Sequence, residues 1–291
     1  MVDAEMTLPD ARTLAYTEIG DPIGAAVFYF HGAPGSRLEP VMFDDAFAGH
    51  HIRLITADRP GYGGSTPLAG RTTAAWADDV TALADHLGID RFGIMGLSSG
   101  GPYTVACAAL LGERVTGVVI AAGNTDMTWP DAADGYLDSE LRIMALDDED
   151  AAVADCIERF GTGGERFFEG ESDLGPADDA FLADADKATA MFTAMAEAFR
   201  QGVTGYAHDI TVQGRAWTFD PASITAPVIV VHGELDRLVP ITHSFHTADL
   251  IPGSEMRAFP DRGHLSLTEE LPALAAEITA GHGETPSTIE A

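Results

Sequence analysis

Short apolar runs alternate along this chain with amphipathic stretches long enough to form helices. Such an alternation is typical of parallel β-α-β construction, in which helices cover both faces of a central sheet. Runs rich in Val, Ile and Phe suit strands that are buried on both faces. We therefore predict an α/β fold with a mostly parallel central sheet flanked by helices. The expected core strands are 25–32, 52–58, 91–97, 115–123, 227–233 and 256–261, with 13–20 as an edge strand, and the expected helices include 73–87, 99–111 and 265–280.

Between residues 126 and 215 the alternation stops, and apolar residues recur with a helical period instead. This segment contains 21 acidic and 6 basic residues and no strand pattern. We interpret it as a helical cap, or lid, inserted between two strands of the core. The predicted organisation is a first part of the core at 1–125, the cap at 126–215 and a second part of the core at 216–291.

The formal net charge is −30, from 46 acidic against 16 basic residues, and Lys187 is the only lysine. Such a chain offers no basic face to nucleic acid or to anionic lipid. We interpret the acidity as serving solubility or adaptation to salt. The expected partner is therefore a small-molecule substrate and not nucleic acid, and the sequence does not distinguish a monomer from a homodimer.

Several features bear on where the protein works. The longest apolar run, 115–123, is far shorter than the ~20 residues that span a bilayer. The acidic N-terminus lacks the basic and apolar pattern of a secretory signal. Two cysteines, Cys107 and Cys156, give no disulfide framework. We expect a cytoplasmic protein without a membrane span.

The stretch GIMGLSSGG, residues 93–101, places two serines between a predicted strand and a predicted helix. A strand–turn–helix corner of this kind is the context of a Gly-x-Ser-x-Gly nucleophile elbow. The tight turn leaves no room for bulky side chains two residues to either side of the nucleophile. Ser98 has glycine at both of those positions, whereas Ser99 would have Leu97 at one of them. We therefore predict Ser98 as the nucleophile.

A serine hydroxyl needs a base and an acid that orients the base. In this arrangement the histidine comes last in the chain, on a loop after a late strand. His264 follows the last predicted strand and precedes the last predicted helix, so we predict it as the base. His232 ends a strand, where we expect packing or local hydrogen bonds. His243, His246 and Asp249 could mimic a metal cluster, but their spacing does not bring three ligands to one side.

The acid is expected after the strand 227–233, where HGELDRLVP offers Glu234 and Asp236. Asp236 lies further into the loop, just before an apolar stretch that could anchor it, whereas Glu234 is interpreted as a loop carboxylate in water. An acid that holds an imidazole in one tautomer must be shielded. We therefore prefer Asp236.

A tetrahedral intermediate requires hydrogen-bond donors for its oxyanion. The segment YFHGAPGS, residues 29–36, ends a predicted strand, and its glycines let backbone amides turn toward a site. We predict the amide of Ala33 as one donor. The amide of Ser99, at the start of the predicted helix where the helix dipole also helps, is the other.

Five motifs in this order resemble those of the α/β-hydrolase superfamily in its cap-bearing form: HGAPGS, DRPGYGGS, GLSSGG, HGELDRLVP and RGHLSL. The resemblance covers most of the chain outside the predicted cap. The site residues that it implies are Ser98, Asp236 and His264 as a catalytic triad, with the amides of Ala33 and Ser99 as oxyanion donors. DRPGYGGS resembles a structural loop of the family, so its Asp58 and Tyr62 are expected to be scaffold.

A serine at the corner argues against haloalkane dehalogenases and epoxide hydrolases, which use aspartate there. The His-Gly-Gly-Gly motif of many lipases and the Gly-Gly-Ser-Trp-Gly elbow typical of proline iminopeptidases are both absent. The resemblance implies first a serine carboxylesterase that cleaves a small or medium, uncharged, fairly apolar ester through an acyl-enzyme on Ser98. An aminopeptidase, a carbon–carbon bond hydrolase and a non-hydrolytic ligand receptor on the same fold remain as alternatives. No cofactor is implied, because the glycine patterns of phosphate loops and dinucleotide sites are missing, and the histidine spacing gives no reason to expect a metal.

Overall fold

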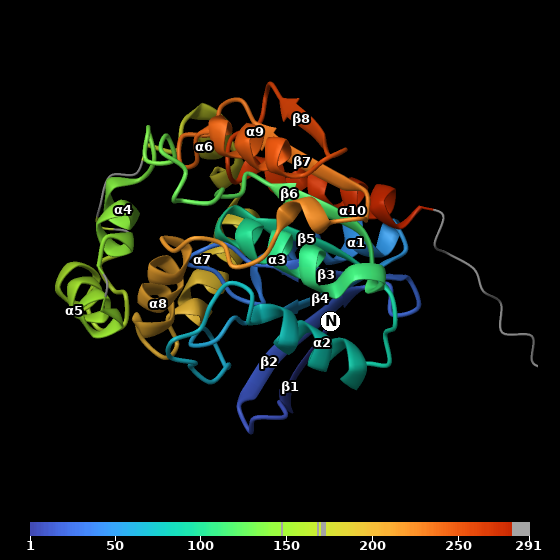
Figure 1. Ribbon diagram of the computed structural model, residues 1–291, viewed down its shortest axis with the longest axis horizontal. Coiled ribbons are helices and arrows are strands. Elements are labelled where there is room, and N and C mark those ends of the chain that lie inside the picture. Colours follow the sequence, from blue (N-terminus) through green and yellow to red (C-terminus); the bar gives the residue numbers. More distant parts are fainter. Residues whose placement is uncertain (147, 168, 170–172, 281–291) are drawn as a thin grey trace, which may run out of the picture.

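The structure, a computed structural model, describes residues 1–146, 148–167, 169 and 173–280. Within these residues an eight-stranded sheet has the order β1-β2-β4-β3-β5-β6-β7-β8 (Figure 1). From β4 to β8 in that order all neighbours are parallel, whereas β1 and β2 pair antiparallel at one end. The strands are β1 (Val2–Thr7), β2 (Thr13–Gly20), β3 (Ala25–Phe30), β4 (Ile52–Ala57), β5 (Phe92–Leu97), β6 (Val115–Ala121), β7 (Val228–Gly233) and β8 (Glu255–Phe259). The predicted α/β fold with a mostly parallel sheet is confirmed.

Helices cover both faces of the sheet, because side chains alternate between the two faces along each strand. In β3, Phe28 and Phe30 belong to one apolar cluster, whereas Val27 and Tyr29 belong to another. The first cluster packs against α2 (Trp76–His86), α3 (Gly101–Leu111) and α9 (Ile241–Leu250). The second cluster packs against α1 (Asp44–Gly49) and α10 (Leu271–Thr279). The remaining short turns of 3₁₀ helix are η1 (Glu39–Phe43), η2 (Ser98–Gly100), η3 (Gly112–Arg114), η4 (Pro221–Ser223) and η5 (Ser266–Glu270).

The predicted edge strand, Thr13–Gly20, forms as β2, but its place at the edge was wrong. It pairs with β1 on one side and with β4 on the other, so β1 is the edge strand. Residues 2–7 alternate between exposed and half-buried side chains along β1. That alternation is the pattern of an antiparallel strand with one face toward water, and it was present in the sequence.

Helix boundaries differ from the predicted ones by a few residues. The helix expected at 73–87 begins at Trp76, and the helix expected at 99–111 is divided into η2 and then α3. The helix expected at 265–280 likewise begins as η5 and continues as α10. In each case a turn of different geometry precedes the α-helix, which is common where a loop enters a helix.

Residues 126–215, called the cap segment below, contain five helices and no strand among their described residues. The chain leaves the sheet after β6 and returns at β7, which lies beside β6. Figure 1 shows α4, α5 and α8 grouped to one side of the sheet. The segment has its own buried cluster, which includes Cys156, Phe199 and Tyr206 and also takes in Tyr62 from the core. The helices are α4 (Asp138–Met144), α5 (Glu149–Phe160), α6 (Pro176–Leu182), α7 (Ala185–Ala198) and α8 (Thr204–Gln213).

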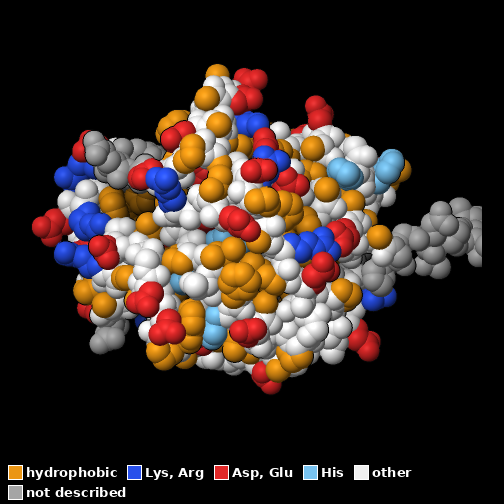
Figure 2. Space-filling model, turned by 90° about the horizontal axis from the view of Figure 1, so that it is seen from above, with side chains coloured by type: hydrophobic (Ala, Val, Ile, Leu, Met, Phe, Trp, Pro, Cys, Tyr) orange, Lys and Arg blue, Asp and Glu red, His pale blue; other side chains and the backbone are white. Residues whose placement is uncertain are grey.

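The acidic surface and the unpaired cysteines are as expected from the sequence. Figure 2 shows acidic side chains spread over the visible face, with basic side chains among them. Both cysteines, Cys107 and Cys156, are free and buried. No helix in the described part of the chain is long and apolar enough to cross a membrane. The second part of the predicted core, 216–291, is described up to residue 280, and its last eleven positions, 281–291, lie outside the described residues.

Candidate active site

The predicted site residues all follow strands of the parallel part of the sheet. Carboxyl ends of parallel strands lie at one edge of a sheet, and the loops after them are the usual place for a site. The positions are Ala33 after β3, Ser98 after β5, Asp236 after β7 and His264 after β8. The topology therefore brings these loops to the same edge.

Ser98 lies at a sharp corner between β5 and α3. Its φ of +54° is in the left-handed region, which L-residues rarely adopt and which costs about 1–3 kcal/mol, so the surrounding structure must hold it in place. A Cβ atom at Gly96 would lie 2.2 Å from Thr104 Oγ1, and one at Gly100 would lie 2.1 Å from the carbonyl oxygen of Phe30. The two glycines that favoured Ser98 over Ser99 are therefore required by close packing around the corner.

This packing predicts that Gly100→Ala lowers the free energy of unfolding by about 1–3 kcal/mol, because the added methyl must displace the backbone of β3. Gly49→Ala is the matched control, since nothing lies within 4 Å of a Cβ atom there. We expect the control to be as stable as the wild type or slightly more so. Urea unfolding followed by circular dichroism measures both, and equal stability of the two variants would contradict the close approach.

His264 and Asp236 form a buried pair. The Nδ1 of His264 lies 2.7 Å from Oδ2 of Asp236, and the aspartate side chain is only 1% exposed. The other oxygen of Asp236 accepts the amides of Leu238 at 2.8 Å and Val239 at 3.0 Å. His232 Nε2 lies 3.2 Å from the same Oδ2. With Nδ1–H donating to Asp236, the neutral His264 ring has Nε2 free to accept a proton.

The electrostatics of the pair separate the two pKa values. Burial disfavours the charged form of His264, but the charge of Asp236, supported by Asp178 and Glu39, outweighs burial and raises the pKa of the imidazole. Burial would raise the pKa of Asp236, but His264 and His232 hold that pKa well below its usual range. The alternative acid, Glu234, is exposed to solvent. The shielded carboxylate is thus Asp236, the residue preferred from the sequence.

The loop after β3 lies against Ser98. A Cβ atom at Gly32 would lie 3.5 Å from Cβ of Ser98. The next residue is Ala33, whose amide has no hydrogen-bond partner among the described residues. Ser99 is the second residue of η2, and the first amides of a helix have no partner within the helix. Both predicted donors are therefore free to bind an oxygen atom.

Two of the three predicted triad residues are hydrogen-bonded to each other, and the third lies at the same edge of the sheet without such a bond. Among the described residues, a hydrogen bond joins His264 to Asp236, whereas none joins His264 to Ser98. Ser98 is half-buried, and Ser99 is buried. The two halves of the predicted triad are thus a hydrogen-bonded His–Asp pair and a serine presented by the strained corner.

Three of the buried acids around the site, none of them singled out from the sequence, bind its loops or neighbouring ones. Glu39 accepts the Tyr29 hydroxyl and the Gly32 amide, the latter at 3.1 Å to Oε2. Asp178 and Asp209 both lie in the cap segment; Asp178 accepts the amide of His264 in the loop after β8, and Asp209 accepts from Arg59 in the loop after β4. No local pattern distinguishes these acids from the many at the surface, and the partners of Asp178 and Asp209 are 86 and 150 residues away in the sequence.

Arg59 links the loop after β3 to the cap segment. Its guanidinium donates to the carbonyl oxygens of His31 and Gly32, the latter at 2.9 Å, and to Asp209 of α8 at 2.7 Å. The backbone amide of Arg59 donates to Nε2 of His31 at 3.1 Å, so Nδ1 of His31 carries the proton and donates to the Gly32 carbonyl at 2.7 Å. His31 is therefore held as a neutral structural residue.

The loop DRPGYGGS has the contacts expected of scaffold. Asp58 is buried and accepts the amides of Arg37 at 2.7 Å and Gly64 at 2.9 Å. Tyr62 is also buried, and its hydroxyl donates to Asp209 at 3.2 Å.

Of the other candidate histidines, His232 also contacts Asp236, whereas His243 and His246 are engaged elsewhere. His232 Nδ1 lies 2.7 Å from the Ser244 hydroxyl, which agrees with its predicted local bonding. His243 stacks on Tyr136 with 5.2 Å between ring centroids, and His246 stacks on Trp129 at 4.2 Å. Within the described residues no group of three His, Cys, Asp or Glu side chains could hold a metal ion.

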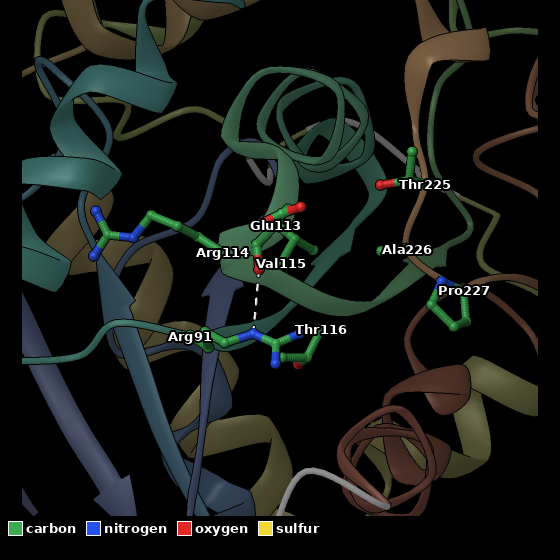
Figure 3. Close-up of a pocket in the computed structure, with 8 residues that line it drawn as sticks. All are labelled: Arg91, Glu113, Arg114, Val115, Thr116, Thr225, Ala226 and Pro227. Atoms are coloured by element: carbon green, nitrogen blue, oxygen red, sulfur yellow. Dashed lines mark hydrogen bonds between the residues drawn. The ribbon is translucent and has the colours of Figure 1, made fainter.

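A pocket of about 560 Å³ lies far from these residues. Figure 3 shows Thr225, Ala226 and Pro227 on one side of it and Arg91 and Thr116 opposite. These positions are at or near the amino ends of β5, β6 and β7, whereas Ser98 and Asp236 follow the carboxyl ends of β5 and β7. The pocket has no side chains that pair a nucleophile with a base, and it is separate from the candidate active site.

Comparison with known proteins agrees with the fold described above. The sequence model of the Alpha/beta hydrolase family matches residues 27–278. A probable proline iminopeptidase of Leptolyngbya boryana is 24% identical over 87% of this chain and 85% of its own length. A hydrolase from Pseudomonas aeruginosa has a TM-score of 0.68 at 20% identity, covering 97% of this chain and 98% of its own. An esterase from Exiguobacterium antarcticum has a TM-score of 0.70 at 18% identity, covering 96% and 100%. The chain belongs to the alpha/beta hydrolase family.

Proposed function

We propose that this protein is a serine hydrolase that cleaves small or medium, uncharged, fairly apolar carboxylic esters. The observation that carries the proposal is the buried His264–Asp236 pair at the same sheet edge as Ser98 on its left-handed corner. An imidazole with Nδ1 fixed by a carboxylate is the base that a serine hydroxyl requires. Catalytic hydrogen bonds are often long or poorly aligned before substrate binds, so a hydrogen bond between Ser98 and His264 is expected to form in the complex.

The proposed reaction has two halves. His264 Nε2 takes the proton of Ser98 as its Oγ attacks the ester carbonyl, and the amides of Ala33 and Ser99 bind the resulting oxyanion. The alcohol leaves with the proton from His264, which gives an acyl-enzyme on Ser98. Water then attacks the acyl carbonyl as it loses a proton to His264, and His264 returns that proton to Oγ of Ser98 as the acid is released, while Asp236 holds the ring in one tautomer throughout.

We also propose that the cap segment, 126–215, covers this site and shapes the substrate pocket. Three contacts support it, each between a helix of the cap segment and a loop of the candidate site. Ser36, in the loop after β3, donates to the Ala194 carbonyl of α7 at 2.7 Å. Lys187 of α7 pairs with Glu269 of η5. Asp178 of α6 binds the loop after β8.

An aminopeptidase is the second candidate, and Glu140 of α4 favours it. This carboxyl is buried in the cap segment and close enough to His264 to feel its charge. A buried carboxylate there could pair with the free amine of a peptide substrate. However, Tyr136 donates to it at 2.5 Å and Tyr206 at 3.3 Å, and burial raises its pKa to about 7. A half-protonated, already hydrogen-bonded acid is a weak amine site, so the ester is preferred.

The substrate class is tested with p-nitrophenyl esters of increasing acyl length against aminoacyl p-nitroanilides. We expect turnover of the esters and little turnover of the anilides. Glu140→Gln should leave ester hydrolysis nearly unchanged, whereas it should lower anilide hydrolysis if Glu140 binds an amine. Fast anilide turnover with inert esters would overturn the preference, and stoichiometric binding without turnover of either would favour a ligand receptor.

The raised pKa of His264 predicts the pH dependence of kcat/KM for an ester. Protonated imidazole cannot accept the serine proton, so the rate falls as the pH drops through the pKa of His264. Because Asp236 raises that pKa above the usual 6.5, half of the maximal rate should be reached above pH 6.5. Initial rates from acidic to mildly alkaline pH measure it, and a midpoint below 6.5 would contradict the stabilisation of the imidazolium by Asp236.

A further inference from the structure

Asp178 of α6 binds the loop that carries His264, from 86 residues away in the sequence. Its Oδ2 accepts the backbone amide of His264 at 2.8 Å. Its Oδ1 accepts both the amide of Ser266 at 2.9 Å and the hydroxyl of Ser266 at 2.8 Å. One carboxylate therefore fixes two amides of the loop after β8 and the start of η5.

This carboxylate is compensated by hydrogen bonds and not by an ion pair with any side chain that the structure describes. Asp178 is fully buried, and no Arg, Lys or His side chain within the described residues forms an ion pair with it. Burying an unpaired carboxylate is costly unless hydrogen bonds compensate it. The three donors that compensate it all come from the loop with His264. The free-energy cost of burying Asp178 is therefore offset only by fixing the loop that carries His264.

The contact is also tight in shape. A Cβ atom at Gly263 would lie 2.5 Å from Oδ1 of Asp178, so a glycine is needed for the carboxylate to approach. The amide of Gly263 donates to the Ser266 hydroxyl at 2.8 Å, which in turn donates to Asp178. The backbone on both sides of His264 is held by this one acid of the cap segment.

We propose that Asp178 is a positioning residue for His264, so that the base is correctly placed only while α6 is docked. The inference rests on the proposed role of His264 as the base. Asp178 holds the backbone, and Asp236 holds the ring at Nδ1. The only lysine, Lys187, adds a second contact from the cap segment by pairing with Glu269 in η5. Docking of the cap segment and assembly of the base are thereby coupled.

Asp178 also contributes charge at this position. The acids that face His264 come from four elements, namely Asp236 from the loop after β7, Asp178 from α6, Glu39 from η1 and Glu140 from α4. Removing one negative charge lowers the pKa of the imidazole. Loss of Asp178 should therefore move the acidic limb of kcat/KM to lower pH, an effect that general destabilisation of the fold would not produce.

The test compares Asp178→Asn with Asp179→Asn, its exposed neighbour on the same helix. The asparagine cannot accept from both sides of the loop, because its amide nitrogen is a donor. We expect Asp178→Asn to lower kcat for an ester by about tenfold to a hundredfold with little change in KM, as misplacement of a catalytic group does. Its acidic limb should move to lower pH, and the amides of His264 and Ser266 should lose protection from hydrogen exchange. Asp179→Asn should match the wild type in all of these measurements.

The inference would be overturned if Asp178→Asn had the kcat, the acidic limb and the amide protection of the wild type. It would also be overturned if kcat fell while the acidic limb and the amide protection stayed unchanged. If Asp178→Asn does not fold, Ser266→Ala decides, because it removes one hydrogen bond to Asp178 and keeps the charge. It should lower kcat and leave the limb in place, and wild-type kcat would overturn the inference. Turnover by Ser98→Ala would instead refute the proposed function, so the two failures are distinguishable.

Discussion

Ser98→Ala is expected to lower kcat/KM for ester hydrolysis by about 10⁴-fold or more. The substitution removes the only atom that forms the acyl-enzyme in the proposed reaction, while the corner keeps its buried neighbours. Initial rates with a p-nitrophenyl ester measure the loss. Ser99→Ala is the matched control, and it should retain most of the activity, because alanine keeps the backbone amide that the proposal uses.

Two outcomes would contradict this prediction. A rate near that of the wild type in Ser98→Ala would place the nucleophile elsewhere. A loss in Ser99→Ala as large as in Ser98→Ala would mean that the two hydroxyls cannot be assigned from the glycines around them. Circular dichroism of each variant controls for misfolding.

Asp209→Ala is expected to lower the free energy of unfolding by about 3–5 kcal/mol, the usual cost of removing one partner from a buried ion pair. Asp209 is fully buried and accepts from Arg59 and Arg71, each at 2.7 Å, and from Tyr103 at 2.5 Å. Burial would raise its pKa, but the two guanidinium groups outweigh burial and hold the pKa far below the usual range. Alanine would leave both buried arginines without a counter-charge.

Denaturant unfolding of Asp209→Ala measures this effect beside Asp249→Ala. Asp249 is exposed, so its removal should change stability by no more than about 0.5 kcal/mol. A loss below about 1 kcal/mol in Asp209→Ala would show that solvent or a neighbouring acid compensates the arginines. Because Arg59 also holds the carbonyls of His31 and Gly32, the variant is expected to disturb the loop of the proposed oxyanion donors as well.

The parts of the fold that were predicted correctly depend on local pattern. The buried strands β5, β6 and β7 show as continuous apolar runs, because helices cover them on both faces. The sharp corner at Ser98 could be located because a left-handed turn requires small neighbouring residues, here Gly96 and Gly100. The place of β1 was missed although its alternation was visible, since a short acidic strand at the edge gives little apolar signal.

The supporting residues of the site could not be predicted, for a different reason. Asp178 and His264 are 86 residues apart, and Arg59 and Asp209 are 150 apart. Nothing in either local sequence specifies the partner, and the cap segment has many other acids of the same type. Their burial is decided by how the cap segment docks on the loops of the core, which is a property of the packed molecule and not of any short stretch.

The central claim is that Ser98 is the nucleophile served by His264 and Asp236. Labelling with a fluorophosphonate, followed by peptide mapping, tests it most directly, because the reagent bonds to a serine only where a base and oxyanion donors activate it. The account predicts one modified residue, Ser98, with labelling lost in Ser98→Ala and kept in Ser99→Ala. Labelling of Ser98→Ala at the wild-type rate, or a label mapped to Ser99, would contradict it.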